Sequence, residues 1–209
     1  MPLAGRPLVE WSIAACRAAP SVRSILVACP PGHGHDLGGH DLGVVDGGAT
    51  RAKSVSNALQ AVGTELVAIH DAARPLVTSD LMEDVVATLV ADPDAAGAIA
   101  ATPITDTIKR VKRPPLTTSG GAKGGHVIES TVDRDVLWAA QTPQVFWVEA
   151  LREALAADPE WSAAATDEAM MVEAAGAKVL IHPSSTENFK VTTPLDLVLA
   201  EVLLAETGT

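Results

Sequence analysis

Short apolar runs alternate along the chain with stretches in which apolar residues recur at helical spacing. The runs that predict buried strands are 24–29, 44–46, 66–70 and 97–102. The stretches that predict helices are 8–18, 54–62 and 79–90, the last with Ser79 as its expected N-cap. Strands and helices that alternate in this way indicate an α/β three-layer sandwich with a mainly parallel sheet.

The pattern changes between residues 105 and 138. Alternating apolar and polar residues at 108–111 and 127–132 predict two short strands, and the segment between them is rich in Pro, Thr, Ser, Gly and Lys. This β-arm is expected to project as a hairpin without a core of its own, which favours pairing with another subunit. Beyond the arm, the expected elements are helices at 148–156, 166–175 and 195–206 and a strand at 178–182.

The length of 209 residues fits one domain, 1–209, with the arm as a subregion. Asp and Glu number 26 against 15 Lys and Arg, so the net charge is -11. A surface of this sign repels nucleic acid and anionic membranes, and neither is expected as a partner. An anionic substrate therefore requires that the few basic residues converge on one site.

Two features of the sequence indicate a cytoplasmic protein. The two cysteines, Cys16 and Cys29, are too few for a disulfide framework, and reduced thiols are expected. No apolar run is long enough to predict a membrane span, and the first residues do not resemble a signal peptide.

Two polar clusters follow predicted strands, where ligands bind in sheets of this kind. The first is Asp46-Gly47-Gly48, followed by Arg51 and Ser54, and the second is His70-Asp71-Ala72-Ala73-Arg74-Pro75. The two glycines let the backbone approach a ligand, with Arg51 and Ser54 as donors, although a tight turn with a capping serine explains them equally well.

Three charged residues are candidates for binding a phosphorylated ligand. Asp71 suits a ribose hydroxyl or a magnesium ion, and Arg74 suits a phosphate; a local Asp–Arg pair on a surface loop is the alternative. Lys190 offers a point charge for phosphate or is a solvated lysine at a strand end. Residues 33–41 hold three histidines and two aspartates without helical or hairpin spacing, so no metal site is predicted there.

Seven motifs follow one another along nearly the whole chain. They are Val45-Asp46-Gly47-Gly48 with Arg51 and Ser54-Val55, His70-Asp71-Ala72-Ala73-Arg74-Pro75, Pro103-Ile104-Thr105-Asp106-Thr107-Ile108-Lys109, Thr131-Val132-Asp133-Arg134, Gln141-Thr142-Pro143-Gln144-Val145-Phe146, Thr166-Asp167-Glu168-Ala169 and Asn188-Phe189-Lys190-Val191-Thr192. In this order they resemble the 2-C-methyl-D-erythritol 4-phosphate cytidylyltransferase family of the non-mevalonate isoprenoid pathway. The resemblance implies a Rossmann-like nucleotidyltransferase fold and a homodimer whose β-arms interlock. It also implies a reaction, dependent on Mg²⁺ bound mainly through the CTP phosphates, that gives CDP-methylerythritol and pyrophosphate.

The resemblance also implies which residues bind each substrate. Those expected to bind CTP are Gly48, Ala49, Ser54, Asp71 and Ala72. Those expected to bind the acceptor alcohol phosphate, partly across the dimer, are Arg74, Thr107, Thr142 and Thr166. Arg134 and Lys190 would position the acceptor phosphate for attack. The attacking phosphate oxygen is already ionised at pH 7, so the reaction needs alignment and charge stabilisation rather than a general base.

The sequence departs from the family at its beginning. Family members start with a strand, a Gly-rich loop containing an arginine and a Pro-Lys pair, whereas residues 1–8 align with the stretch that follows these. We expect a start upstream of Met1, and we expect the missing central strand to leave a gap between unpaired strand edges. Two alternatives stay open: a ribitol-5-phosphate cytidylyltransferase, which Ala72-Ala73 and Glu168-Ala169 disfavour, and a non-catalytic dimeric homologue without the nucleotide loop.

Overall fold

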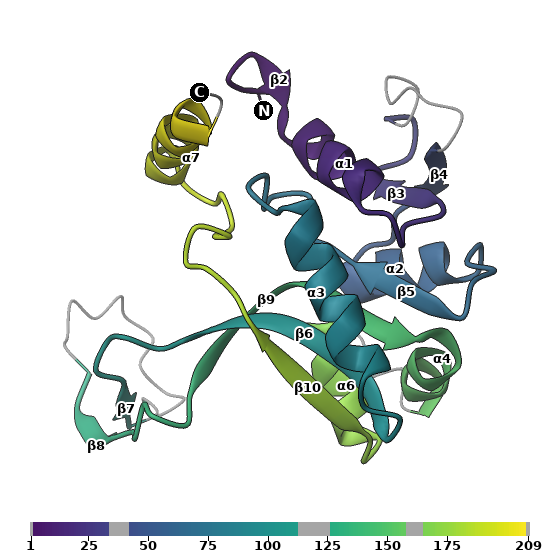
Figure 1. Ribbon diagram of the computed structural model, residues 1–209. Coiled ribbons are helices and arrows are strands. Elements are labelled where there is room, and N and C mark those ends of the chain that lie inside the picture. Colours follow the sequence, from purple (N-terminus) through teal and green to yellow (C-terminus); the bar gives the residue numbers. More distant parts are fainter. Residues whose placement is uncertain (1, 34–41, 113–125, 158–164, 208–209) are drawn as a thin grey trace.

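The computed structural model describes residues 2–33, 42–112, 126–157 and 165–207 (Figure 1). The helices are α1 (Leu8–Ala18), α2 (Arg51–Leu59), α3 (Ser79–Val90), α4 (Val148–Ala157), α6 (Glu168–Ala174) and α7 (Pro194–Thr207). The strands are β1 (Pro2–Leu3), β2 (Arg6–Pro7), β3 (Ile25–Cys29), β4 (Leu42–Asp46), β5 (Leu66–Ile69), β6 (Ala95–Pro103), β7 (Lys109–Val111), β8 (Ile128–Thr131), β9 (Trp138–Trp147) and β10 (Lys178–Pro183). The expected bounds of α1 and α3 are confirmed, but Thr78 caps α3 in place of Ser79, because its side chain accepts a hydrogen bond from the Leu81 N–H.

The central sheet has four strands in the order β10-β6-β9-β5. Strand β10 runs parallel to β6, and β9 runs antiparallel to both β6 and β5. Three of the four strands therefore point the same way, and the sheet is mostly but not wholly parallel. Strand β9, which breaks the parallel order, is not among the strands predicted from the sequence.

Helices cover both faces of this sheet, as a three-layer sandwich requires. On one face, Val85 and Leu89 of α3 pack with Val145 of β9. On the other face, Phe146 of β9 packs with Leu151 of α4 and with α6. Because successive β9 residues point to opposite faces, this one strand contributes to both cores.

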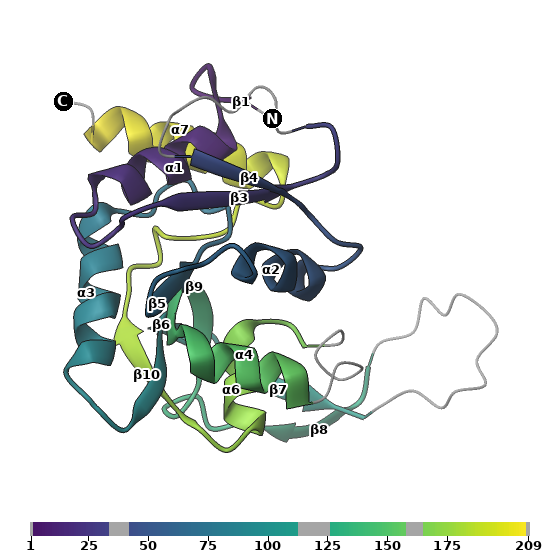
Figure 2. The ribbon, with the colours of Figure 1, turned by 90° about the vertical axis from the view of Figure 1, so that its right-hand side faces the viewer.

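Strands β3 and β4 pair parallel in a separate two-stranded sheet (Figure 2). A cavity of about 730 Å³ lies between β3 and β5, and α1 and α2 complete its wall. Within the described ranges, β3 and β5 have no pairing partner on the sides that line this cavity. This confirms the expected gap between unpaired strand edges. Burial beside the cavity raises the pKa of the Cys16 thiol to about 11, so this group stays protonated at neutral pH.

The β-arm pairs β7 with β8 in antiparallel register, for example Arg110 opposite Ser130. Figure 1 shows the arm projecting beyond the end of the central sheet. Its tip, 113–125, lies outside the described residues. At the other end of the molecule α7 packs against β1 through Leu3 and Ala200. No helix in the described part of the chain is long and apolar enough to cross a membrane.

The contact between β6 and Phe146 gives a test of the packing. A Cβ at Gly97 would lie 2.3 Å from Cδ1 of the Phe146 ring, whereas a Cβ at Gly63 would meet nothing within 4 Å. We expect Gly97→Ala to reduce the free energy of unfolding by about 1–3 kcal/mol, because the buried ring must move. Urea unfolding measures this, with Gly63→Ala as the matched control; equal effects of the two substitutions would contradict the packing.

Candidate active site

Asp71 lies immediately beyond β5, in a turn closed by the Arg74 N–H donating to the Asp71 carbonyl over 2.9 Å. Its side chain is largely buried, and each carboxylate oxygen has its own cation. Arg51 Nε donates to Oδ1 over 3.0 Å, and Lys190 Nζ donates to Oδ2 over 3.0 Å. Burial opposes ionisation of Asp71, but the Lys190 hydrogen bond and the Arg51 charge outweigh it, and the pKa of Asp71 is lowered. Asp71 is therefore ionised at neutral pH.

Arg51 also contacts a second carboxylate. Its Nη1 lies 2.6 Å from both Oε1 and Oε2 of Glu168, a side chain that is 0% exposed. Burial raises the pKa of Glu168, while contact with Arg51 acts in the opposite direction. Glu168 begins α6, and Arg51 begins α2, so this ion pair joins the first turns of two helices.

His70 and Thr142 hold the Asp71 turn through a chain of hydrogen bonds. A carbonyl only accepts, so His70 Nε2 carries the proton that it donates to the Arg74 carbonyl over 3.1 Å. Burial lowers the pKa of His70 to about 4, so the ring is neutral and Nδ1 accepts from the Thr142 hydroxyl over 2.9 Å. The same hydroxyl accepts the Asp71 N–H over 3.0 Å. The hydrogen of Thr142 is thus directed to His70.

Arg74 and the loop before Lys190 are joined by a second set of polar contacts. Arg74 Nη1 donates to the Asn188 carbonyl over 2.8 Å, and the Val191 N–H donates to the Ala73 carbonyl. The buried Asn188 amide donates to Thr142 O and to Gln141 Oε1 over 2.9 Å each. The buried Nε of Arg74 has no partner among the described residues. These contacts bring the predicted Arg74 and Lys190 to the same place as Asp71.

The Gly47–Gly48 segment lies at the end of β4 and leads into α2. Gly48 N–H donates to Ser54 Oγ over 2.9 Å, and Ser54 Oγ donates to the Thr50 carbonyl over 3.0 Å. A Cβ on Gly48 would lie 2.2 Å from Cγ of Lys53, so this position excludes larger residues. Ala49, next to it, is exposed. Ser54 therefore stabilises the turn, whereas Thr50 is the N-cap of α2.

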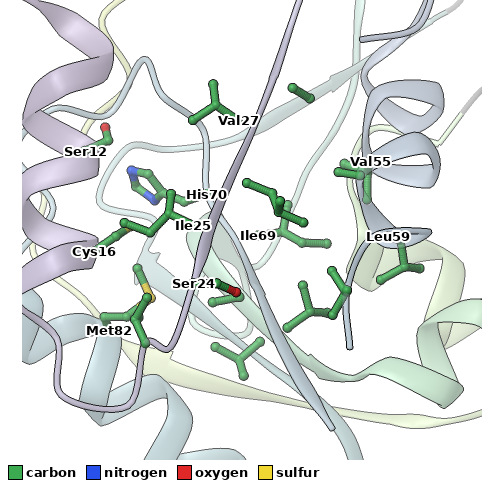
Figure 3. Close-up of a pocket in the computed structure, with 18 of the residues that line it drawn as sticks. Ser12, Cys16, Ser24, Ile25, Val27, Val55, Leu59, Ile69, His70 and Met82 are labelled. Carbon is green, nitrogen blue, oxygen red and sulfur yellow. The ribbon is translucent and has the colours of Figure 1, made fainter. Parts of the chain in front are cut away.

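The cavity between β3 and β5 reaches these residues, since Arg51, Ser54, Asp71 and Ala72 are part of its wall. Figure 3 shows that His70 and Ile69 line it together with residues of β3 and α1. Its lining is mostly apolar, with polar residues at both ends of β5. His70, Asp71 and Arg51 lie at the carboxyl end of β5, which is where ligands bind in open α/β sheets.

Three predicted acceptor-binding residues lie apart from this cluster. Thr107 and Arg134 belong to the arm, where both are exposed and Arg134 Nη1 donates to the Thr105 carbonyl. Thr166 is exposed just before α6. The hydrogen bond of Arg134 stays within the arm, so a single chain does not bring this residue to Asp71.

Arg51 was predicted only as a possible donor to a ligand at Gly47–Gly48, and Glu168 and His70 were given no individual role, although each lies within one of the seven motifs. Arg51 had a detectable signal, because a basic residue at the start of a helix opposes the helix dipole. Glu168 had none, since an acidic residue in a first turn is ordinary. Among the described residues no three His, Cys, Asp or Glu side chains are grouped to hold a metal ion, and 34–41 lie outside them.

An α/β sandwich with cations gathered beyond the carboxyl end of a strand, here the edge strand β5, is typical of enzymes that act on phosphorylated substrates. The family model described as 2-C-methyl-D-erythritol 4-phosphate cytidylyltransferase matches residues 1–206. The chain belongs to this family, and is thus a nucleotidyltransferase that transfers a cytidylyl group from CTP to 2-C-methyl-D-erythritol 4-phosphate.

Individual relatives agree with the family model. The proteins of that name from Bordetella petrii and Symbiobacterium thermophilum are each 39% identical to this chain; the matches cover 95% and 99% of this chain and 86% and 84% of theirs. The crystal structure of the Thermus thermophilus protein of that name has a TM-score of 0.79 and 35% identity, covering 98% of this chain and 92% of that one. Neither the ribitol phosphate alternative nor the non-catalytic alternative gains support from these comparisons.

The buried, neutral His70 gives a pH-dependent stability. The unfolded chain takes up a proton below about pH 6.5, and the folded chain does so only near pH 4. The stability due to neutral His70 is therefore complete above pH 6.5 and is lost as the pH falls towards 4, by up to about 3 kcal/mol.

We expect His70→Gln to remove most of this slope in urea unfolding measured between pH 4 and 7. The exposed His126 in the arm provides the control, and His126→Gln should leave the slope unchanged. Parallel pH profiles for the wild type and His70→Gln would show that the ring is not held neutral.

Proposed function

We propose how the described residues divide the work of cytidylyl transfer between the two substrates. The observation that carries the proposal is the contact of Asp71 with Lys190 beyond β5, beside Arg74. Two anionic substrates must be brought into line there, and the pair places an exposed ammonium next to a carboxylate that fixes it. A general base is not required, because the attacking phosphate oxygen is ionised.

The nucleotide side comprises Gly48, Ala49, Ser54, Asp71 and Ala72. Gly48 and Ala49 belong to the turn between β4 and α2, and Ser54 in α2 accepts a hydrogen bond from the Gly48 N–H. Gly48 has no side chain, and Ala49 is small and exposed. Such a turn lets a base or ribose approach the backbone closely. Asp71 and Ala72 also line the cavity and would contact the ribose.

The acceptor side comprises Lys190, Arg74, Thr142 and Thr166. Lys190 is 43% exposed and presents its ammonium to the acceptor phosphate, with Arg74 nearby. The Thr142 hydrogen is already donated to His70, so this residue would shape the acceptor site through the Asp71 turn. Thr166 adds an exposed hydroxyl at the start of α6.

Mg²⁺ is proposed as the cofactor, held mainly by the CTP phosphates. Magnesium sites in nucleotide enzymes commonly combine one or two carboxylates with substrate phosphates. Asp71 fits that requirement, because it is ionised and each carboxylate oxygen has a second lone pair beyond its hydrogen bond to a cation. The ion would offset phosphate charge, while the protein residues bind and align the two substrates.

A homodimer is proposed to complete the site, with Thr107 and Arg134 supplied by the arm of the partner subunit. The arm presents Val127 and Ile128 at 63% and 58% exposure, which leaves apolar surface for a partner to cover. Arg134 needs such an arrangement to reach the acceptor phosphate beside Lys190. A cytoplasmic location is proposed as well, supported by the two free cysteines.

The two phosphate-positioning cations give the first test. We expect Arg134→Ala and Lys190→Ala each to lower kcat by about 10²-fold or more, because each removes charge stabilisation at the reacting phosphates. Pyrophosphate release from CTP, methylerythritol phosphate and Mg²⁺ is measured, on this chain and on one extended upstream in frame. Arg110→Ala, in the same arm, is the control. Unchanged kinetics of both site variants would overturn the assignment of Arg134 and Lys190. Turnover of ribitol phosphate equal to that of methylerythritol phosphate would overturn the assignment of the acceptor.

Mixing the two inactive variants tests whether the site is shared between subunits. If Arg134 acts across the dimer, a heterodimer of Arg134→Ala and Lys190→Ala subunits contains one intact site, so random mixing should restore about a quarter of wild-type activity. Asp71→Asn mixed with Lys190→Ala is the matched control, because both changes fall in the same half-site and no activity should return. Recovery in neither mixture would place Arg134 in the site of its own subunit.

A further inference from the structure

Arg51 occupies a position that its local surroundings disfavour. It is the first residue of α2, where the helix dipole favours negative side chains, and that first turn contains no acidic residue. A residue that breaks a local rule needs a compensating contact elsewhere. The guanidinium finds two, with Asp71 and Glu168, which are 20 and 117 residues away along the chain.

Glu168 fixes one side of the guanidinium. Its carboxylate is fully buried, and Arg51 provides the ion-pair contact of both its oxygens at 2.6 Å. The first turn of α6 also favours the negative charge. Burial lowers the pKa of Arg51, but the charge and hydrogen bonds of Glu168 outweigh it, and the pKa is raised. Arg51 is therefore a permanent cation in a fixed place.

The other side of the guanidinium fixes Asp71. Nε donates to Asp71 Oδ1, and Asp71 Oδ2 accepts from Lys190, which gives the series Glu168–Arg51–Asp71–Lys190 with alternating charge. The positive charge of Arg51 is offset by a buried carboxylate, whereas Lys190 is 43% exposed and lies open to a ligand. The two cations beside Asp71 thus differ in what they can do.

We propose that Arg51 is a positioning residue for cytidylyl transfer: Glu168 fixes its guanidinium, which fixes the Asp71 carboxylate and, through it, the Lys190 ammonium. The inference rests on the roles proposed above for Asp71 and Lys190. Its rival is a direct role, in which Arg51 binds a phosphate of CTP. The two roles predict different effects of removing the Glu168 carboxylate. If Arg51 is a positioning residue, its guanidinium loses its fixed place; if Arg51 binds a phosphate of CTP, its guanidinium becomes freer to do so.

Kinetics of Arg51→Lys, Glu168→Gln and the double variant separate the two roles. Lysine retains the charge but cannot form the fork that joins two carboxylates. We expect both single variants to lower kcat by about 10–100-fold, as for other residues that orient a group at the site, while KM for CTP changes by less than about twofold. The double variant should be no slower than the slower single variant, because both changes break the same contact.

A second ion pair serves as the matched control. Lys178 Nζ and Asp92 Oδ2 are also 2.6 Å apart, but this pair is exposed and belongs to β10 and the end of α3. Lys178→Met and Asp92→Asn should leave kcat and KM unchanged. Thermal unfolding of every variant checks that the fold is intact, and Glu168→Asp, which keeps the charge, replaces Glu168→Gln if the latter unfolds.

Three results would overturn the proposal. A raised KM for CTP in Arg51→Lys together with a lowered KM in Glu168→Gln would make Arg51 a phosphate ligand. Wild-type kcat in both single variants would make the ion pair irrelevant to the reaction, and multiplicative losses in the double variant would mean that the two side chains act separately. Lys190→Ala, run in parallel, distinguishes these from failure of the proposed site, which would leave Lys190→Ala fully active.

Discussion

Strand β9 supplies the contacts that place the Asp71 turn, the loop before Lys190 and the start of α6. The paired residues of β9 are interrupted between Ala140 and Gln144, where the register with β6 shifts. Residues 141–143 in this interruption have their polar groups free of the ladder, and they reach the loops instead. Thr142 Oγ1 accepts from the Asp71 turn and its carbonyl accepts from Asn188, while Gln144 binds the start of α6 through Asp167. Strand β9 is buried between β5 and β6. Loops that are distant in sequence are therefore positioned by hydrogen bonds to the same strand.

The electrostatics of the site follow from this placement. The chain carries a net charge of -11, yet the groups around Asp71 alternate in sign and the series from Glu168 to Lys190 is neutral overall. A series with no net charge does not attract an anion as a whole. It can contribute to anion binding only by placing the exposed Lys190 ammonium. Arg74 lies beside it, and the proposed partner arm adds Arg134. Local placement of three cations therefore decides the field that two phosphorylated substrates meet, irrespective of the net charge.

The elements predicted correctly from the sequence are those whose apolar residues recur at a single regular spacing. Helices α1 and α3 were predicted with their observed bounds, whereas α2 begins three residues before its expected start because Thr50 caps it. Strand β9 was missed because its apolar residues do not alternate and Pro143 argues against a central strand. Pro143 is tolerated because it falls in the unpaired interruption of the ladder, a long-range property that no local pattern reports.

The same distinction applies to the site. Motifs at strand ends led to Asp71, Arg74 and Lys190, and the structure brings these together. Periodicity and charge patterns do not report which residues will meet over 117 positions, so the Arg51–Glu168 pair was not foreseen. Thr107 and Arg134 reach the site only through the proposed subunit contact, and for them the sequence offered only the resemblance.

The burial of Glu168 bears on why such a pair is retained. Buried ion pairs commonly add little to stability, because desolvation of two charges offsets their attraction, and apolar residues of similar size serve a core as well. Stability alone therefore gives weak reason for a fully buried carboxylate beside an arginine at a disfavoured helix position. Geometry gives a stronger one: an apolar substitute would fill the space but could not orient the guanidinium, and Asp71 would lose the donor to Oδ1. The Arg51–Glu168 pair thus contributes little or nothing to folding stability, but it holds the Asp71 carboxylate in one orientation beside Lys190.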